Sequence, residues 1–268
     1  MAQRAKNKSL VAKILGICRQ AVYYSPSQIQ KDQVLVQQIK DAHLDHPAYG
    51  HRRMAIHLQV NHKRTERIIK KYNLKPPRGK RRKHFCTKSS NDHAYTNLIK
   101  DILKDKIIPH HIWVSDISYL KYQGQFWYLA TIEDVATRRI LAAQVGKHHD
   151  AVLILNAIKQ AIQASVHLPI YFHSDQGREY MARVVTQYLE LQGVKVSVSA
   201  AASPWQNGYK ESFFGRFKNE FGDINRFNSA GELIEEIYSQ IHYYNHERIH
   251  TALKMSPVAY ANRLRQCV

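Results

Sequence analysis

Cysteine is scarce in this chain, and so are long apolar segments. The three cysteines, Cys18, Cys86 and Cys267, are far apart and form no CxxC pair. Their spacing argues against a disulfide framework and against a structural zinc site. No run of about 18 apolar residues occurs, and the N-terminus has no apolar stretch of the signal-peptide type. We therefore expect a cytoplasmic protein in a reducing compartment, without membrane contact.

Acidic residues are also few, which leaves a strongly basic chain. The sequence has 40 Lys and Arg against 21 Asp and Glu, a net charge of +19. Residues 1–95 hold 21 of the cations and 5 of the acids, whereas the remainder holds 19 and 16. A single charged segment is usually a solvated face. A net charge of +16 over one third of the chain instead favours a module that binds a polyanion, attached to a nearly neutral body.

Apolar periodicity in the first third predicts helices. Residues 8–24 suggest two short helices, 27–45 a longer helix that ends before Pro47, and 62–74 a cationic helix. Helices separated by short turns outline a helix-turn-helix, and a cationic helix after such a turn suits the DNA major groove. A solvated amphipathic helix is the alternative. The candidate DNA contacts of this region are Arg52, Arg53, Lys63, Arg64 and Arg67.

A basic segment over residues 75–95 predicts a linker. Its first nine residues, 75–83, include six cations together with proline and glycine, and they cannot form a core. Such a segment can lie along a phosphate backbone and release counterions. The candidate phosphate contacts of the linker are Arg78, Lys80, Arg81, Arg82 and Lys83.

From residue 112 the pattern changes to strands. Strands over 112–122, 125–133 and 138–146, with tight turns between them, predict an antiparallel meander. The elements expected after it are a helix at 150–165, a strand at 170–172, a helix at 178–192, a strand at 194–198 and a helix that Glu211 begins. This is the element order of the ribonuclease H fold.

Three carboxylates stand at distinctive places in this order. Asp116 lies within an apolar strand, Asp175 directly follows a strand, and Glu211 begins a helix after a further 35 residues. Singly, each has an ordinary explanation: an edge residue, a turn-forming Asp, and a favourable charge at a helix start. In the expected fold, however, these three places can converge. Gathered carboxylates suit two hard divalent cations, which support displacement at a phosphodiester.

The helix that follows Glu211 carries a cation on the same face. Glu211, Gly215 and Lys218 have the spacing i, i+4 and i+7. We expect Lys218 to contact DNA close to the carboxylates, with an exposed helix lysine as the alternative. The residues expected on the packing side are Phe213, Phe214, Phe217 and Phe221.

Several other polar residues have structural interpretations. Asp134 is expected to organise the turn into 137–139, and Glu179 is expected to lie on the next helix. The adjacent pairs 110–111 and 148–149 are histidines in a poor arrangement for metal ligands, and we expect them at the surface. Ser229, followed three residues later by Glu232, predicts a capping box.

Together, these motifs resemble those of insertion-sequence transposases of the OrfB type, in the retroviral-integrase-like superfamily with a DDE triad. The matching segments are 113–119, 173–180, 203–214, 244–250, 256–257 and, upstream, 49–53. The similarity extends over about residues 8–262. The resemblance implies an α/β fold, with a ribonuclease H-like mixed five-stranded sheet and flanking helices, preceded by an all-α helix-turn-helix region. The regions expected are a DNA-binding region at 1–74, the linker at 75–95, an integrase catalytic core at 96–225 and a C-terminal helical extension at 226–268.

The resemblance also implies a reaction and its partners. It implies cleavage at transposon ends, followed by attack of the exposed 3′-hydroxyl on target DNA. Asp116, Asp175 and Glu211 would hold two Mg²⁺ ions, which Mn²⁺ can replace. The implied partners are double-stranded DNA carrying the terminal repeats, target DNA, further copies of the chain in a homo-oligomer on DNA, and an OrfA-type protein or fusion from an upstream frame. The implied location is the bacterial cytoplasm, in association with the nucleoid when DNA is bound.

Two alternatives stay open at this point. The chain departs from relatives that carry leucine-zipper heptads or an N-terminal His/Cys zinc module. A transposase-derived DNA-binding regulator without catalysis would need the same basic region, and the intact triad favours the enzyme over it. A nuclease of the same fold would need the same carboxylates, and the helical DNA-binding region argues against it.

Overall fold

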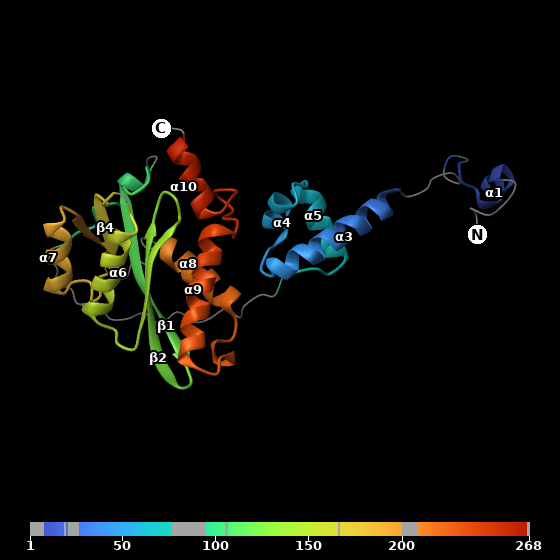
Figure 1. Cartoon of the computed structure of the whole chain (residues 1–268). Coiled ribbons are helices and arrows are strands. Elements are labelled where there is room, and N and C mark those ends of the chain that lie inside the picture. Colours follow the sequence, from blue (N-terminus) through green and yellow to red (C-terminus); the bar gives the residue numbers. More distant parts are fainter. Residues whose placement is uncertain are drawn as a thin grey trace. The chain divides into compact units, whose positions relative to one another are not determined.

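The computed structural model describes residues 8–18, 20, 27–76, 95–104, 107–165, 167–199 and 208–266. The chain divides into two compact units, Met1–Pro76 and Pro77–Val268 (Figure 1). Most of the second of the two short helices predicted within 8–24, and all the candidate DNA contacts of the linker, lie outside the described residues. Within the described ranges, no helix is long and apolar enough to cross a membrane.

The first unit is helical. Its elements are α1 (Lys8–Leu15), α3 (Ser27–Asp45), α4 (His51–His57) and α5 (His62–Lys71). Helix α5 packs against α3 and α4, and Ile39, Met54 and Ile68 are fully buried. The side chain of Asn61 caps α5 by accepting a 2.9 Å hydrogen bond from the Lys63 amide. The helix ends before Asn73, whose φ of 53° is left-handed.

The second unit is built on the predicted five-stranded mixed sheet. Its strands are β1 (Ile112–Tyr122), β2 (Gln125–Asp134), β3 (Ile140–Gly146), β4 (Tyr171–Ser174) and β5 (Lys195–Val198). The order is β3-β2-β1-β4-β5, with β1, β2 and β3 antiparallel and β4 and β5 parallel to β1. The ribonuclease H-like fold expected from the sequence is confirmed.

Helices cover both faces of this sheet (Figure 1). Helices α6 (Ala151–Gln163) and α7 (Arg183–Leu191) pack on one face, and α8 (Gly208–Phe221) and α9 (Ala230–His246) on the other. Helix α10 (Pro257–Gln266) packs on α9. The predicted capping box is present, because Ser229 Oγ accepts a 3.1 Å bond from the Glu232 amide and the Glu232 carboxylate accepts one from Asn228.

The largest departure from the expected elements is the start of α7. The sequence predicts a helix from residue 178, whereas α7 begins at Arg183. A turn replaces the first helical residues, with the Gly177 carbonyl accepting 3.1 Å bonds from the amides of Tyr180 and Met181. Glu179 therefore lies in this turn, and the prediction that it lies on the helix is wrong.

Candidate active site

The strand register places Asp116 and Asp175 at matching positions. The parallel pairing of β1 with β4 ends at Val114 and His173. Two residues further along each segment, Asp116 stands within β1 and Asp175 directly follows β4. Since neighbouring strands lie about 4.8 Å apart, a continuation of this register would bring the two carboxylates to the same point of the sheet.

Asp116 lies on the face of the sheet that α8 covers. Leu120 and Tyr122 of β1 pack with Phe213 and Phe217 of α8. Alternate residues of a strand share a face, so Asp116 points to the same side. The four phenylalanines expected on the packing side of α8 are all buried, which confirms that prediction.

Glu211 belongs to the first turn of α8, which begins at Gly208. The structure does not describe its side chain. Among the side chains that are described, no group of three His, Cys, Asp or Glu is placed to hold a metal ion. Helix α8 packs on the face of the sheet that carries Asp116, and the assignment of Glu211 as a third ligand remains a prediction.

Asp116 and Asp175 both affect the pKa values of the same two tyrosines, Tyr119 and Tyr180. Burial raises the pKa of Tyr180 well above its ordinary value, and the negative charges of Asp116 and Asp175 raise it further. Burial raises the pKa of Tyr119, and the same two carboxylates contribute to that shift. Burial also raises the pKa of Asp175, opposed by a 3.1 Å hydrogen bond from the Gly177 amide and by His149. A cation bound beside Asp175 would offset the cost of its charge.

Buried hydrogen bonds fix the strands beneath these acids. Ser115 Oγ lies 3.0 Å from the Tyr180 hydroxyl and donates a 3.2 Å bond to the Thr131 carbonyl. His173 is fully buried, with Ser197 Oγ 2.9 Å from Nδ1 and Ser199 Oγ 3.1 Å from Nε2. Burial lowers the pKa of His173 to about 4, so its imidazole is neutral at pH 7.

Ser118 supplies a buried hydroxyl on the face of Asp116. Ser118 lies two residues after Asp116 in β1 and is 4% exposed. Its Oγ makes no hydrogen bond to any described residue. A buried polar group without a partner costs free energy unless a ligand or water satisfies it. This hydroxyl is therefore suited to a polar ligand held beside Asp116.

His149 and Glu179 form a pair near the acids that the sequence interpretation missed. His149 Nε2 lies 3.2 Å from Glu179 Oε1, and its ring stacks on Tyr128 with centroids 5.1 Å apart. His149 is predicted at the surface, and its side chain is 27% exposed, with Tyr119, Tyr128 and Glu179 around it. A Cβ at position 177 would overlap the Glu179 carboxylate, so Gly177 leaves the space this acid occupies.

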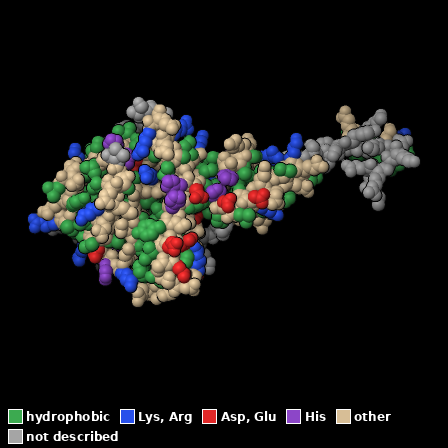
Figure 2. Space-filling view, in the orientation of Figure 1, with side chains coloured by type: hydrophobic (Ala, Val, Ile, Leu, Met, Phe, Trp, Pro, Cys, Tyr) green, Lys and Arg blue, Asp and Glu red, His purple; other side chains and the backbone are tan. Residues whose placement is uncertain are grey.

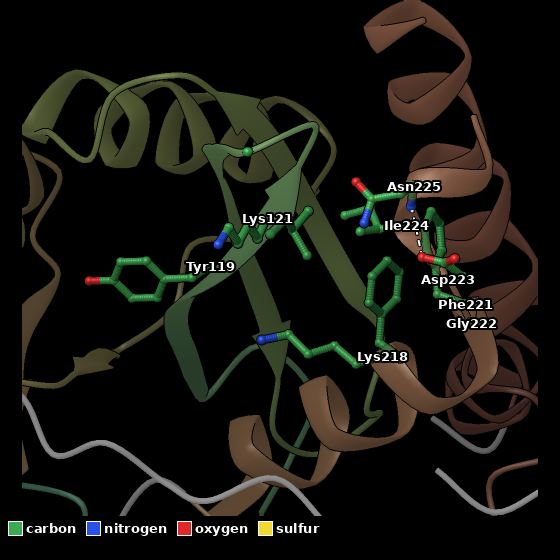
Figure 3. Close-up of a pocket in the computed structure, with 11 residues that line it drawn as sticks. Tyr119, Lys121, Lys218, Phe221, Gly222, Asp223, Ile224 and Asn225 are labelled. Carbon is green, nitrogen blue, oxygen red and sulfur yellow. Dashed lines mark hydrogen bonds between the residues drawn. The ribbon is translucent and has the colours of Figure 1, made fainter. Parts of the chain in front are cut away.

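A groove borders the site at the far end of β1. Tyr119 and Lys121 of β1 and Lys218 of α8 line it, and its volume is about 530 Å³. In Figure 3 these three side chains extend to the same side. Lys218 is half-buried and seven residues after Glu211, about 10 Å along the helix axis. Its predicted contact with DNA near the carboxylates remains a prediction.

The candidate DNA-binding cations of the first unit differ in their contacts within the protein and in their exposure. Arg67 binds the buried Asp32 through two hydrogen bonds of 2.9 and 2.7 Å, and Arg64 donates a 3.1 Å bond to the Lys31 carbonyl. Arg53 lies over the Tyr49 ring. The exposed cations among these candidates are Arg52, Lys63 and Arg67. On the face drawn in Figure 2, Lys and Arg are spread over the second unit rather than gathered in one patch.

Comparison with known proteins identifies relatives over most of the chain. Models of an integrase core domain match residues 108–204 and 192–257. An uncharacterized transposase-like protein of Haemophilus influenzae is 32% identical over 205 residues, covering 76% of this chain and 94% of that protein. The uncharacterized 31 kDa protein of insertion element IS600 from Shigella sonnei is 30% identical over 273 residues, covering 96% and 99%.

A solved structure shares the fold at low sequence identity. A chain in the cryoEM structure of the simian T-cell lymphotropic virus intasome, in complex with the PP2A regulatory subunit B56 gamma, matches with a TM-score of 0.52 and 16% identity. The match covers 83% of this chain and 73% of that chain.

Proposed function

The chain belongs to the insertion-sequence transposases of the DDE integrase superfamily, and we propose that it cuts DNA at transposon ends and joins those ends to target DNA. The observation that supports the proposal is the register of β1 and β4, from which Asp116 and Asp175 are expected at matching positions of neighbouring segments. Glu211, in the first turn of α8, completes the proposed triad.

The donor set fits divalent metal ions. Carboxylate oxygens are the preferred ligands of Mg²⁺ and Mn²⁺, and we assign Asp116, Asp175 and Glu211 as the residues that would hold two such ions. Burial raises the pKa of Asp175, and the buried Ser118 hydroxyl makes no hydrogen bond to the part of the chain that the structure describes; both favour a ligand at this point. When bound, the ions supply Lewis-acid stabilisation of charge on the phosphate and on the attacking and leaving oxygens.

The protein's own contribution to the reaction is to hold the carboxylates and the DNA strand in fixed positions. The hydrogen bond between Ser115 and Tyr180 holds β1 beneath Asp116, and the Gly177 amide orients the Asp175 carboxylate. Lys218 would bind a phosphate of the DNA strand near the scissile bond. Fixed ligands of this kind reduce the reorganisation needed at the moment of reaction.

The first unit and the linker would supply most of the affinity for DNA. We assign residues 1–74 as the DNA-binding region and 75–95 as a basic linker, ahead of the catalytic core at 96–225 and its helical extension at 226–268. Lys63 and Arg52 are exposed cations of α5 and α4 that can contact phosphates. Joining two transposon ends requires at least two active sites, so we propose a homo-oligomer on DNA.

The test is strand transfer by the full chain on a duplex that carries the element's terminal repeat. Wild-type protein should cleave and join DNA with Mg²⁺ or Mn²⁺, and Asp116→Asn, Asp175→Asn and Glu211→Gln should each lose both reactions. Glu235→Gln is the matched control, because Glu235 is an exposed acid on α9. Its activity should equal that of the wild type.

Two results would contradict the proposal. Activity that persists in Asp175→Asn would exclude the triad assignment. DNA binding without cleavage, even with an upstream-frame protein supplied, would favour a DNA-binding regulator.

A further inference from the structure

The hairpin of β1 and β2 extends past the rest of the sheet. Strand β4 pairs with β1 as far as Val114, so among the described residues the segment 117–122 has β2 as its one partner strand. The register pairs Tyr119 with Tyr128 and Lys121 with Phe126. Directly paired and alternate residues share a face, so these four side chains lie on one face of the hairpin.

This face carries a contiguous group of exposed aromatic rings. Tyr119 is 44% exposed and Phe126 is 54% exposed. The Tyr119 ring lies 6.4 Å from that of Phe126 and 5.3 Å from that of Tyr128. A single exposed ring needs no explanation, but adjoining exposed rings indicate an interaction surface. We call the face formed by Tyr119, Lys121, Phe126 and Tyr128 the aromatic shelf.

Cations complement the rings. Lys121 lies on the shelf directly opposite Phe126. Lys218 approaches from α8 and lines the same groove as Tyr119 and Lys121 (Figure 3). Aromatic faces next to cations are the combination that binds unpaired nucleic acid, because bases stack on rings while phosphates bind the cations.

The shelf lies on the face of the sheet opposite the Asp116 side chain, and the two meet at the edge of β1 beyond its pairing with β4. Lys121 is five residues after Asp116 in the same strand, about 16 Å along it. Glu179, Asp175 and Asp116 all lie within electrostatic range of the Tyr119 hydroxyl. A strand held at the carboxylates would reach the shelf within about five nucleotides.

We propose that the aromatic shelf binds unpaired nucleotides of the DNA strand that passes through the carboxylate site, with its bases on Tyr119 and Phe126 and its phosphates at Lys121 and Lys218. The inference rests on the proposed function, because it takes DNA as the substrate. An unpaired strand fits better than a duplex for two reasons. Paired bases offer no open face to a ring, and the groove of about 530 Å³ that Tyr119 and Lys121 also line holds a group the size of one nucleotide.

The test compares two DNA ends. Full-length protein is titrated, with Ca²⁺ in place of Mg²⁺ to prevent cleavage, against a fluorescein-labelled blunt duplex and the same duplex with a short unpaired 3′ extension. Wild-type protein should prefer the unpaired end. Tyr119→Ala and Phe126→Ala should each lower affinity for the unpaired end on the order of 5- to 100-fold and leave affinity for the blunt duplex unchanged.

Two further variants separate stacking from other roles. Tyr119→Phe keeps the ring and should keep the preference for the unpaired end. If the Tyr119 hydroxyl made the contact instead of the ring, this variant would lose the preference. Tyr238→Ala removes a ring of the same type that is 40% exposed on α9, and it should bind both ends as the wild type does. Circular dichroism of each variant checks that the fold is retained.

The outcomes distinguish this inference from the proposed function. Equal affinity of wild-type protein for both ends, or a preference that survives in Tyr119→Ala and Phe126→Ala, would overturn the shelf assignment even if strand transfer proceeds. A preference that these two variants abolish would support the shelf even if no cleavage occurs with Mg²⁺. A shelf that instead binds a second copy of the chain would show as protein dimerisation lost in the same variants and no difference between the two DNA ends.

Discussion

Arg248 donates two hydrogen bonds of 2.6 Å to the carboxylate of Glu220, and the Arg248 side chain is 1% exposed. This pair joins the segment after α9 to the C-terminal part of α8. Asn245 adds a second connection, because its side chain bonds both the amide and the carbonyl of Ile140 at the start of β3. The C-terminal motif at 244–250 therefore fixes α8, which carries Glu211 and Lys218, to the sheet.

Removing the acid of this pair should destabilise the second unit strongly. Glu220→Gln leaves the buried Arg248 charge without its counterion, and we expect a loss of about 3 kcal/mol in the free energy of unfolding. All three tryptophans belong to the second unit, so tryptophan fluorescence during urea unfolding reports this unit alone. Glu236→Gln is the control. Its partner Arg226 is 3.4 Å away and both side chains are over 40% exposed, so the loss should be below about 1 kcal/mol. Equal losses would show that Glu220 has no special structural role.

Divalent metal should stabilise the second unit through Asp175. Burial raises the pKa of this carboxyl, which means that its ionised form costs free energy in the folded protein. Without metal, Asp175→Asn should therefore be at least as stable as the wild type. Metal at a concentration 100 times its Kd should stabilise the wild type by about 2.7 kcal/mol and leave Asp175→Asn almost unchanged. Thermal unfolding with EDTA, Mg²⁺ or Mn²⁺ measures both effects. An equal response of the two proteins would place the metal elsewhere.

Mild acid should weaken the second unit through His173. The pKa of His173 in the folded protein is about 4, lower than the ordinary value of about 6.5. Between these two values the imidazole is protonated in the unfolded chain and neutral in the folded protein. The stability tied to neutral His173 is complete above about pH 6.5 and is lost as the pH falls towards 4. The loss between pH 7 and pH 5 should be about 2 kcal/mol. Urea unfolding at the two pH values should show this difference in wild type and in His148→Asn, an exposed histidine control, but much less in His173→Asn.

The sequence predicts the elements well where local pattern decides them. The limits of β1 and the fold order follow from alternating apolar residues and turn signals, and Asp134 organises its turn as expected, accepting bonds from the amide and hydroxyl of Thr137. The predicted start of α7 differs from the observed one because apolar residues such as Tyr180 continue the helical pattern. In the structure this segment forms a turn, and the Tyr180 hydroxyl lies 3.0 Å from Ser115 Oγ.

Contacts between segments that are distant in the sequence could not be predicted from local sequence patterns. His149 and Glu179 are 30 residues apart, and Asp32 and Arg67 are 35 apart, so neither pair has a signal in sequence spacing. The proximity of Asp116 and Asp175 could be inferred because a known fold order fixes which strands are neighbours. The aromatic shelf could not, because its exposure depends on where β4 stops pairing with β1.

The linker cations should dominate the salt dependence of DNA binding. Replacing the six cations of 75–83 by glutamine keeps the length of the segment and removes its charge. If all six contact phosphates, the slope of log K against log salt should become shallower by about 5 for duplex DNA. The measurement is anisotropy of a labelled duplex over a range of salt concentrations. Lys159→Gln, a single exposed cation on α6, is the control and should leave the slope unchanged. A glutamine variant with the wild-type slope would mean that the segment acts as a spacer and that the contacts come from the helical unit.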